Sequence, residues 1–259
     1  MNTFPEKIFS LNNKVAIVIG GGGVLGGAMA VGLAKAGASV AVLGRTESNI
    51  KARAEESSKY SNSIWVKADA SSKTDLENAL ETIKKEMGIP SILVNAAGIN
   101  STTPFFEITE EEWNKILNIN LKSVFFSCQV FGKAMVDSGK GGSIINISSA
   151  SSELPLSKVF TYSISKAGIN NLTRWLAREF APFNVRVNAI TPGFFPAKQN
   201  RKILTKERVE DIMRHTPMNR FGEPDELVGT VVWLSSDKAS GFVTGAIVSV
   251  DGGFTSMTI

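Results

Sequence analysis

Short runs of hydrophobic, β-branched residues recur along the chain and alternate with longer segments of helical pattern. Residues 14–19 and 39–43 lack polar alternation, which is typical of strands buried on both faces of a sheet. Further strands are predicted at residues 64–67, 92–95, 143–147, 184–190 and 246–250. Helices are predicted at residues 29–36, 47–59, 72–87, 113–137, 160–180 and 224–235. The alternation predicts one α/β domain over residues 1–259, a doubly wound (Rossmann) parallel sheet of about seven strands with helices on both faces.

A glycine-rich turn, residues 20–27, joins the first predicted strand to the first predicted helix. Glycine lets the backbone approach a ligand closely, and the free N–H groups at a helix N-terminus favour an anion. The flanking strand and helix therefore predict a nucleotide phosphate here, although a glycine-rich turn alone is weak evidence for one. The residues expected to contact it are Gly20, Gly22, Gly23, Leu25 and Gly26.

Small and polar residues follow other predicted strands too. The carboxyl ends of parallel strands meet at one edge of a sheet, where such folds bind their ligands. We expect a cofactor at this edge to contact Arg45, Asp69, Ala70, Asn95, Ala96, Gly98, Pro192, Gly193 and Phe195. For residues 95–98, a tight packing turn is the alternative explanation.

The end of the second strand distinguishes NAD from NADP, because an acidic residue there bonds the ribose 2′-hydroxyl. Gly44 and Arg45 occupy this position, so a guanidinium is available to pair with a 2′-phosphate. The sequence therefore favours NADP(H). NAD(H) is the alternative, with Arg45 as a solvated loop residue and Glu47 or nothing at the ribose.

Tyr162 and Lys166 are four residues apart on a predicted helix and therefore share a face. A neighbouring cation favours the phenolate and lowers the pKa of a tyrosine toward the range of a general base. The hydroxyl of Ser149 could bond a substrate alcohol or carbonyl oxygen. Together these groups could handle the proton of a secondary alcohol. The alternative is a surface pair with the tyrosine packed and the lysine solvated.

The predicted helix at residues 113–137 is hydrophobic around most of its circumference, more than one sheet face can cover. We therefore expect its outer side to contact another subunit. Asn120 lies among these hydrophobic residues, and a buried amide requires partners. It is expected either to bond backbone or to hold a water next to Lys166.

Composition excludes several classes of protein. The net charge is only +4 and no basic run is interleaved with aromatics, so no nucleic acid partner is expected. One cysteine, Cys128, and one histidine, His215, cannot supply a disulfide or a typical zinc site, so no metal is expected. No stretch approaches about 18 apolar residues and no signal peptide is evident, so no membrane association and a cytoplasmic location are expected.

Taken together, the motifs resemble the short-chain dehydrogenase/reductase family from about residue 11 to residue 253. The resemblance is carried by the glycine turn, Asn95-Ala96-Ala97-Gly98, Asn120, Ser149 placed 13 residues before Tyr162, Tyr162-x-x-x-Lys166 and Pro192-Gly193. It implies an NAD(P)-dependent oxidoreductase acting on CH–OH groups, usually a homotetramer.

The resemblance also implies a role for each catalytic candidate. Tyr162 would be the general acid/base, and Ser149 would hold the substrate oxygen. Lys166 would lower the tyrosine pKa and bond the nicotinamide ribose, and Asn120 would complete a proton relay through water. Two departures point to weaker cofactor affinity. Val24 replaces the middle glycine of the turn, and Phe195 and its neighbours replace a threonine that usually follows Pro-Gly.

Between residues 194 and 223 the hydrophobic pattern loosens, which indicates a substrate lid. This segment and the glycine turn resemble the D-mannonate oxidoreductase (fructuronate reductase) subgroup, and also gluconate 5-dehydrogenases. The implied substrate is a small sugar acid, D-mannonate or D-fructuronate. The substrate contacts expected are Ser149, Glu153, Gln199, Asn200 and Arg201, and the cations available for its carboxylate are Lys198, Arg201, Arg214 and Arg220.

Three alternatives remain open. The protein could be a gluconate 5-dehydrogenase, or a reductase of a 3-oxoacyl thioester or another carbonyl. It could instead be a nucleotide sensor without catalysis, although the four catalytic candidates are all present.

Overall fold

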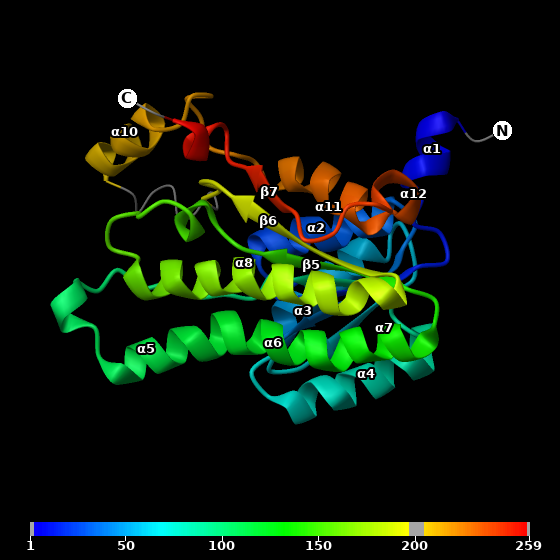
Figure 1. The fold of residues 1–259 in the computed structure, drawn as a ribbon. Helices are drawn as coiled ribbons and strands as arrows, with labels where there is room; N and C mark the ends of the chain where they lie inside the picture. The colour runs from blue at the N-terminus through cyan, green and yellow to red at the C-terminus, as the bar shows by residue number, and fades with distance from the viewer. Residues whose placement is uncertain (1–2, 197–204, 258–259) are drawn as a thin grey trace.

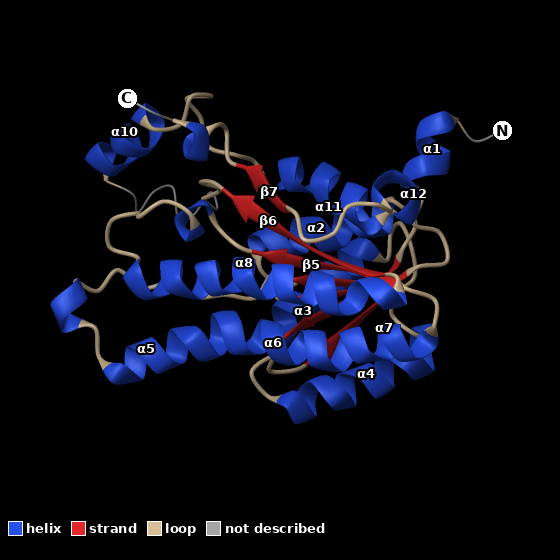
Figure 2. Ribbon diagram, in the orientation of Figure 1, coloured by secondary structure: helices blue, strands red, loops and turns tan. Residues whose placement is uncertain are grey.

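Seven parallel strands form one sheet in the computed structural model, which describes residues 3–196 and 205–257. The strands are β1 (Val15–Ile19), β2 (Ser39–Gly44), β3 (Ser63–Lys67), β4 (Ile92–Asn95), β5 (Gly142–Ile147), β6 (Val185–Pro192) and β7 (Ile247–Val250). Their order across the sheet is β3-β2-β1-β4-β5-β6-β7, with every neighbouring pair parallel (Figure 2). The predicted α/β fold with a doubly wound parallel sheet is confirmed.

Helices cover both faces of this sheet (Figure 1). They are α1 (Phe4–Phe9), α2 (Val24–Lys35), α3 (Glu47–Ser57), α4 (Lys73–Met87), α5 (Glu110–Leu117), α6 (Ser123–Ser127), α7 (Lys133–Ser138), α8 (Phe160–Phe180), α10 (Lys206–Arg214), α11 (Val228–Ser235) and α12 (Asp237–Ser240). Buried side chains of α2, α3 and α11 pack on one face, and those of α4, α6, α7 and α8 on the other. No helix within residues 3–196 and 205–257 is long and apolar enough to cross a membrane.

Local sequence explains why the helices form where they do. Ser72 caps α4, since its hydroxyl accepts a hydrogen bond from Asp75 N at 3.2 Å. Leu76, Leu80 and Ile83 then follow at helical spacing and are buried against the sheet. Gly88, at φ +93°, ends the helix in a backbone conformation that favours glycine.

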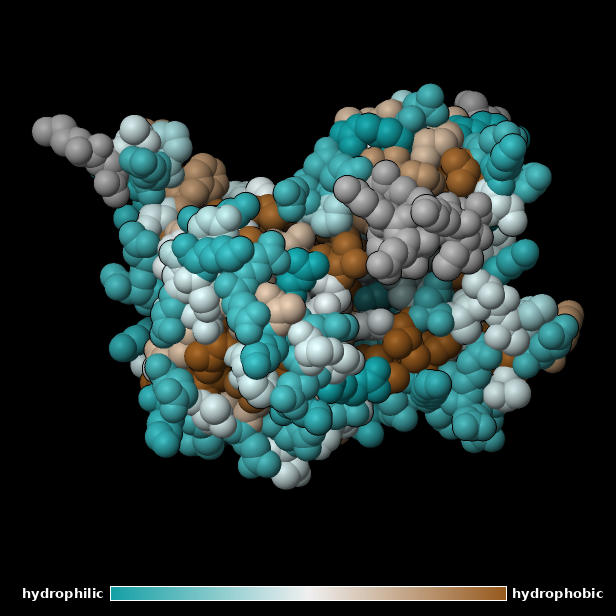
Figure 3. All heavy atoms as spheres, turned by 180° about the vertical axis from the view of Figure 1, so that it is seen from behind, coloured by the Kyte–Doolittle hydropathy of each residue, from teal (hydrophilic) through white to brown (hydrophobic). Residues whose placement is uncertain are grey.

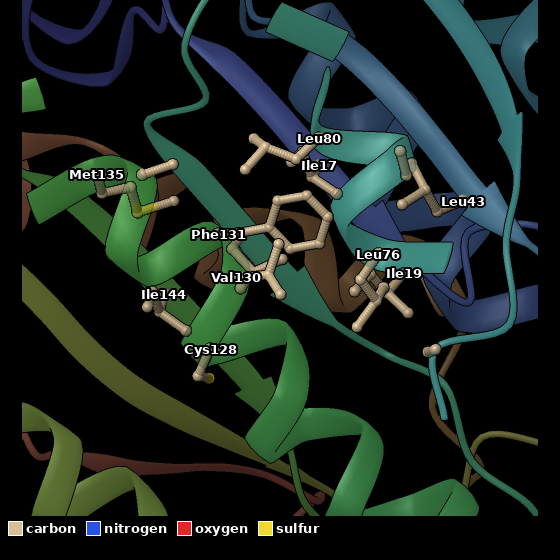
Figure 4. Close-up of a cluster of buried hydrophobic side chains, with 14 of the residues drawn as sticks. Ile17, Ile19, Leu43, Leu76, Leu80, Cys128, Val130, Phe131, Met135 and Ile144 are labelled. Atoms are coloured by element: carbon tan, nitrogen blue, oxygen red, sulfur yellow. The ribbon is translucent and has the colours of Figure 1, made fainter. Parts of the chain in front are cut away.

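The core between α4, the helices on the same face and the sheet is closely packed. Figure 4 shows Phe131 at its centre, with Leu80 of α4 and Ile17 of β1 on one side and Ile144 of β5 on another. All of these side chains are buried.

Figure 3 shows the molecule from behind the view of Figure 1. The surface of this face is mostly hydrophilic, with separate hydrophobic patches.

The helix predicted at residues 113–137 runs from residue 110 to residue 138 and includes two π-turns. These are η2 (Asn118–Lys122) and η3 (Cys128–Gly132), which interrupt the α5, α6 and α7 segments. A π-turn inserts one residue into a helix and is frequent at functional sites. The first of them carries Asn120.

The start of α2 differs from the prediction. We expected a helix from residue 29, whereas α2 begins at Val24, inside the glycine-rich turn. Its glycines obscure the helical pattern because they have no side chains to show periodicity. The helix predicted at residues 160–180 has the predicted bounds, Phe160–Phe180.

Candidate active site

A groove of two adjoining hollows follows the carboxyl ends of the strands. β1 lies between β2 and β4, so the strand order reverses there, and doubly wound sheets bind ligands at such a point. The first hollow, about 260 Å³, reaches the ends of β2 and β3, and the second, about 610 Å³, extends toward α8 and α10. They share Gly20, Gly23, Ala96, Gly98 and Ile99. An extended ligand could therefore occupy both.

The glycine turn has the geometry of a phosphate cradle. Gly20 has φ +78°, and a Cβ on it would lie 2.6 Å from the backbone nitrogen of Ala97, so only glycine fits. The first intrahelical bond of α2 runs from Gly27 N to Gly23 O at 2.8 Å, which leaves the preceding helical N–H groups outside the ladder. Close backbone approach and free N–H groups together fit a dinucleotide pyrophosphate.

Val24 stands in place of the middle glycine of the turn. It is the first residue of α2, is 41% exposed and borders the second hollow. Gly23 caps the helix and borders both hollows, as expected if it serves in place of the missing glycine.

The first hollow brings together the residues expected at the adenosine end, Arg45, Asp69 and Ala70. The Asp69 carboxylate accepts hydrogen bonds from the Ser71 N–H at 2.9 Å and the Ser71 hydroxyl at 2.7 Å, which fixes the loop after β3. Arg45 is exposed, and none of the ion pairs between described residues includes it. Glu47 pairs with Lys67 at 3.9 Å.

The second hollow contains Ser149, Tyr162 and Lys166 in its wall. Ser149, at the end of β5, forms a side-chain hydrogen bond with Tyr162. The Ser149 hydroxyl also accepts hydrogen bonds from the Ser151 N–H at 3.2 Å and the Ser151 hydroxyl at 3.1 Å. With both acceptor positions filled, its own hydrogen is directed to Tyr162 or to a substrate oxygen.

Lys166 is almost completely buried, with 4% of its surface exposed. Its Nζ donates to Ile147 O at 2.7 Å and lies 5.5 Å from the centre of the Tyr162 ring. Burial lowers the pKa of Lys166 to about 8, because an ammonium is poorly solvated there.

The expected effect of Lys166 on Tyr162 requires a correction. Burial raises the pKa of Tyr162 above its usual value, and the hydrogen bond with Ser149 lowers it only in part. The sequence suggested the opposite direction because it shows the neighbouring cation but not the loss of solvent around the phenol. At neutral pH Tyr162 is therefore a neutral phenol, the form that donates a proton.

Asn120 is fully buried and bonds backbone, one of the two arrangements expected for it. Its Oδ1 accepts from Ile99 N at 2.8 Å, and its Nδ2 donates to Ile99 O at 2.9 Å and to the Ser165 hydroxyl at 3.0 Å. A Cβ on Gly98 would lie 3.5 Å from both Asn120 Oδ1 and Lys166 Nζ, so these two groups flank the same glycine. The π-turn thus ties the loop after β4 to α8, the helix that carries Tyr162 and Lys166.

The sequence comparisons agree with this geometry. The family model described as enoyl-(acyl carrier protein) reductase matches residues 23–255. The chain belongs to the short-chain dehydrogenase/reductase family. It is 39% identical to the Bacillus subtilis oxidoreductase UxuB, over 95% of this chain and 96% of that protein. It is 36% identical to the 5-keto-D-gluconate 5-reductase of Escherichia coli K12, over 96% of this chain and 98% of that protein.

Solved structures of this short-chain dehydrogenase/reductase fold are similar over nearly the whole chain. A putative D-mannonate oxidoreductase from Haemophilus influenza with bound NAD has a TM-score of 0.92 at 32% identity, covering 99% of both chains. A gluconate 5-dehydrogenase from Burkholderia cenocepacia in complex with NADP and tartrate has a TM-score of 0.91 at 29% identity, covering 98% of this chain and 100% of that chain. Related structures thus contain NAD or NADP, and this chain is an NAD(P)-dependent oxidoreductase acting on CH–OH groups.

Most of the cofactor residues expected for this dehydrogenase border one or both hollows, but Asn95 does not. It is buried beneath them, where its Nδ2 donates to Asn146 Oδ1 at 2.8 Å and its Oδ1 accepts from the Ser127 hydroxyl at 2.7 Å. Asn146 Nδ2 in turn donates to the Thr173 hydroxyl of α8 at 3.0 Å.

The Cys128 thiol adjoins Asn95. Burial raises the pKa of this thiol to about 12, so it stays protonated.

Only some of the residues expected to contact the substrate lie in the described parts of the chain. Gln199, Asn200 and Arg201, together with Lys198, lie outside the described residues. Glu153 is exposed and borders neither hollow. Arg214 pairs with Asp211 at 2.5 Å, and Arg220 pairs with Glu226 at 2.6 Å.

Sequence reasoning missed Arg208 and Ser151, which both border the second hollow. A signal for Arg208 exists in the sequence. It precedes Ile212 by four residues in a helix capped by Thr205, so the two side chains share a face, and Ile212 is 3% exposed. Ser151 has no comparable signal, because its bond to Ser149 depends on the turn after β5.

Proposed function

We propose that this enzyme transfers hydride between NAD(P) and a secondary alcohol or ketone of a sugar acid, D-mannonate/D-fructuronate in the first instance. The observation that carries the proposal is the Ser149–Tyr162 hydrogen bond in the wall of a hollow that continues from the glycine turn. The names of the relatives, which include a D-mannonate oxidoreductase and a 5-keto-D-gluconate reductase, support a sugar acid.

In this proposal the protein handles the proton and the positions of the reactants, and the bound nicotinamide supplies or accepts the hydride. Tyr162 gives a proton to the ketone oxygen, or takes one from the alcohol, while Ser149 holds the same oxygen. Lys166 holds the nicotinamide ribose, and Asn120 takes part in the proton relay. The segment at about 194–223 acts as a lid over the substrate.

A second candidate is reduction of 5-keto-D-gluconate, which the name of the Escherichia coli relative favours. The two reactions share the carboxylate and the secondary alcohol, and they differ in the stereochemistry that the hollow accepts.

The test is oxidation of NADPH and of NADH by the purified protein with D-fructuronate, 5-keto-D-gluconate and an acetoacetyl thioester. Turnover of fructuronate alone would support the mannonate assignment, and turnover of 5-keto-D-gluconate alone would support the second candidate. Activity only on the thioester would move the function to acyl reduction. Tight cofactor binding with no turnover would support a nucleotide sensor.

We propose NADP(H) as the preferred coenzyme, with NAD(H) as the alternative. Because Arg45 borders the first hollow and forms no ion pair with a carboxylate of the described residues, its guanidinium is available to pair with a 2′-phosphate. Replacing Arg45 by Ser is expected to raise KM for NADPH roughly tenfold and to leave KM for NADH unchanged. Roughly tenfold corresponds to the lower end of the free energy of a charge-assisted hydrogen bond, as suits an exposed site.

The matched control is Lys51→Ser, which removes an exposed cation of α3 that borders neither hollow. It should leave both coenzyme KM values unchanged. Equal changes for NADPH and NADH in Arg45→Ser would refute pairing with the 2′-phosphate.

The proposed assembly is a homotetramer that buries the outer side of α5, α6 and α8. Trp175 and Phe125 are 57% and 43% exposed there, and with Leu117, Leu121 and Leu172 they border a hollow of about 650 Å³. Light scattering should give four times the monomer mass of 27.8 kDa. A monomeric mass would contradict a subunit contact on this face.

A further inference from the structure

The wall of the second hollow has an unbalanced charge. Among its described residues, the charged side chains are Lys166 and Arg208, both cationic, and no carboxylate borders the hollow. The rest of the wall is hydrophobic or neutral, so nearby protein charges do little to screen these cations. A hollow with this lining favours an anion over a neutral molecule.

Lys166 is already engaged at the catalytic end. It is buried, its Nζ bonds Ile147 O at 2.7 Å, and it lies beside Tyr162. It therefore cannot also reach a group at the far end of a substrate.

Arg208 is differently placed. It projects from α10, is half-buried, and donates one bond, from Nη1 to the Ser157 hydroxyl at 2.9 Å. None of the ion pairs formed between described residues includes Arg208, whereas Arg214 and Arg220 both have carboxylate partners. Since a guanidinium has five N–H donors, most of its hydrogen-bonding capacity is available.

Local sequence holds Arg208 in this position. The Thr205 hydroxyl caps α10 by accepting from Arg208 N at 3.2 Å, and Ile212, one turn later, is buried against the same hollow. Ser157 lies in the loop that leads into α8. The guanidinium thus bridges α10 and the loop that leads into α8, the helix of Tyr162.

We propose that Arg208 binds the carboxylate of the acid substrate. The carboxylate would accept hydrogen bonds from the guanidinium N–H groups that Ser157 leaves free. The inference rests on the proposed function, because it assigns the acid end of the same substrate. A planar guanidinium matches a carboxylate with two parallel hydrogen bonds, which a lysine cannot reproduce. Since the carboxylate does not change during the reaction, this contact is equal in the ground state and the transition state. It therefore sets KM and the choice of acid over neutral sugar, and leaves kcat nearly unchanged.

The test compares each acid with its neutral counterpart, which has CH₂OH in place of the carboxylate: D-fructuronate with D-fructose, and 5-keto-D-gluconate with L-sorbose. Arg208→Gln is expected to raise KM for the acid about 10- to 100-fold, with kcat within a few-fold and no change for the neutral sugar. Arg208→Lys should bring KM for the acid part of the way back to the wild-type value, since lysine keeps the positive charge but cannot form the two parallel hydrogen bonds. Lys206→Gln, which removes an exposed positive charge from the same helix, should behave as wild type. An unchanged KM for the acid in Arg208→Gln would overturn the proposal.

A binding measurement separates this inference from the proposed function. The affinity of D-mannonate and of neutral D-mannitol for the protein–NADP⁺ complex can be read from protein fluorescence. Mannonate binding that is lost in Arg208→Gln, without turnover of any sugar acid, would defeat the proposed function and support the role of Arg208. Mannonate binding no tighter than mannitol binding, or equal in wild type and Arg208→Gln, would overturn the role of Arg208 whichever carbonyl the enzyme reduces.

Discussion

Tyr162→Phe is expected to lower kcat by about 10²- to 10⁴-fold, the usual contribution of a positioned general acid or base. The substitution removes only the hydroxyl, which forms the bond with Ser149 and would exchange the proton with the substrate oxygen. The ring keeps its place beside Lys166, so NADPH binding should be unchanged. Steady-state kinetics and a coenzyme titration on the same preparation check both expectations.

The chain offers a matched control for this variant, because it contains one other tyrosine. Tyr60 is 52% exposed and lies outside the groove, so Tyr60→Phe should retain full activity. Turnover of Tyr162→Phe within a few-fold of wild type would refute the role assigned to Tyr162.

The direction of the Tyr162 pKa shift also determines a pH profile for the wild-type enzyme. Because burial raises this pKa, the phenolate is scarce at neutral pH, and alcohol oxidation should accelerate as pH rises. Ketone reduction uses the protonated phenol and should not gain from higher pH. An oxidation rate that stays flat from about pH 6 to about pH 9 would show that another group takes the proton.

Lys166→Met is expected to abolish activity and yet stabilise the fold at neutral pH. Lowering the pKa of a buried lysine from 10.5 to about 8 implies a destabilisation of about 3 kcal/mol when the group is charged. Methionine has a similar length and no charge, and it forfeits about 1–3 kcal/mol because it leaves the buried Ile147 O without its donor. The net gain in the free energy of unfolding should be at most about 2 kcal/mol, measurable by urea denaturation at pH 7.

The gain should vary with pH in a defined direction. Between the folded pKa of about 8 and the unfolded value of 10.5, the unfolded wild-type chain binds more protons than the folded chain, so wild-type stability rises with pH. The advantage of Lys166→Met should therefore shrink over this range and be absent above it. Lys133→Met, at a lysine side chain that is 73% exposed, should change stability little at any pH. A destabilised Lys166→Met at pH 7 would show that the ammonium is well accommodated.

Sequence patterns predicted the parts of the fold that repeat a simple periodicity. The α8 helix was predicted with its observed bounds because its polar and hydrophobic positions follow one helical period over 21 residues. The strands were predictable because they are continuous hydrophobic runs. The π-turns were not, since one inserted residue barely disturbs the hydrophobic pattern of a helix that is buried on most sides.

The candidate site was predictable where it depends on position along the chain, and not where it depends on surroundings. Strand ends and the spacing from Tyr162 to Lys166 place most of its residues in one groove. The direction of the Tyr162 pKa shift depends on burial, which a sequence does not state. Arg208 was missed because its helical spacing to Ile212 shows only a shared helix face, whereas its bond to Ser157 is visible only in three dimensions.

The buried chain from Asn95 through Asn146 to Thr173 joins the strand beneath the cofactor groove to the helix that carries Tyr162 and Lys166. Hydrogen bonds of fixed direction add to the hydrophobic packing of α8 and favour one alignment of the helix on the sheet. A single substitution in the chain leaves a buried partner without its bond, at about 1–3 kcal/mol. Its members can therefore be exchanged only as a set, and together they keep α8 in one alignment with the carboxyl ends of the strands.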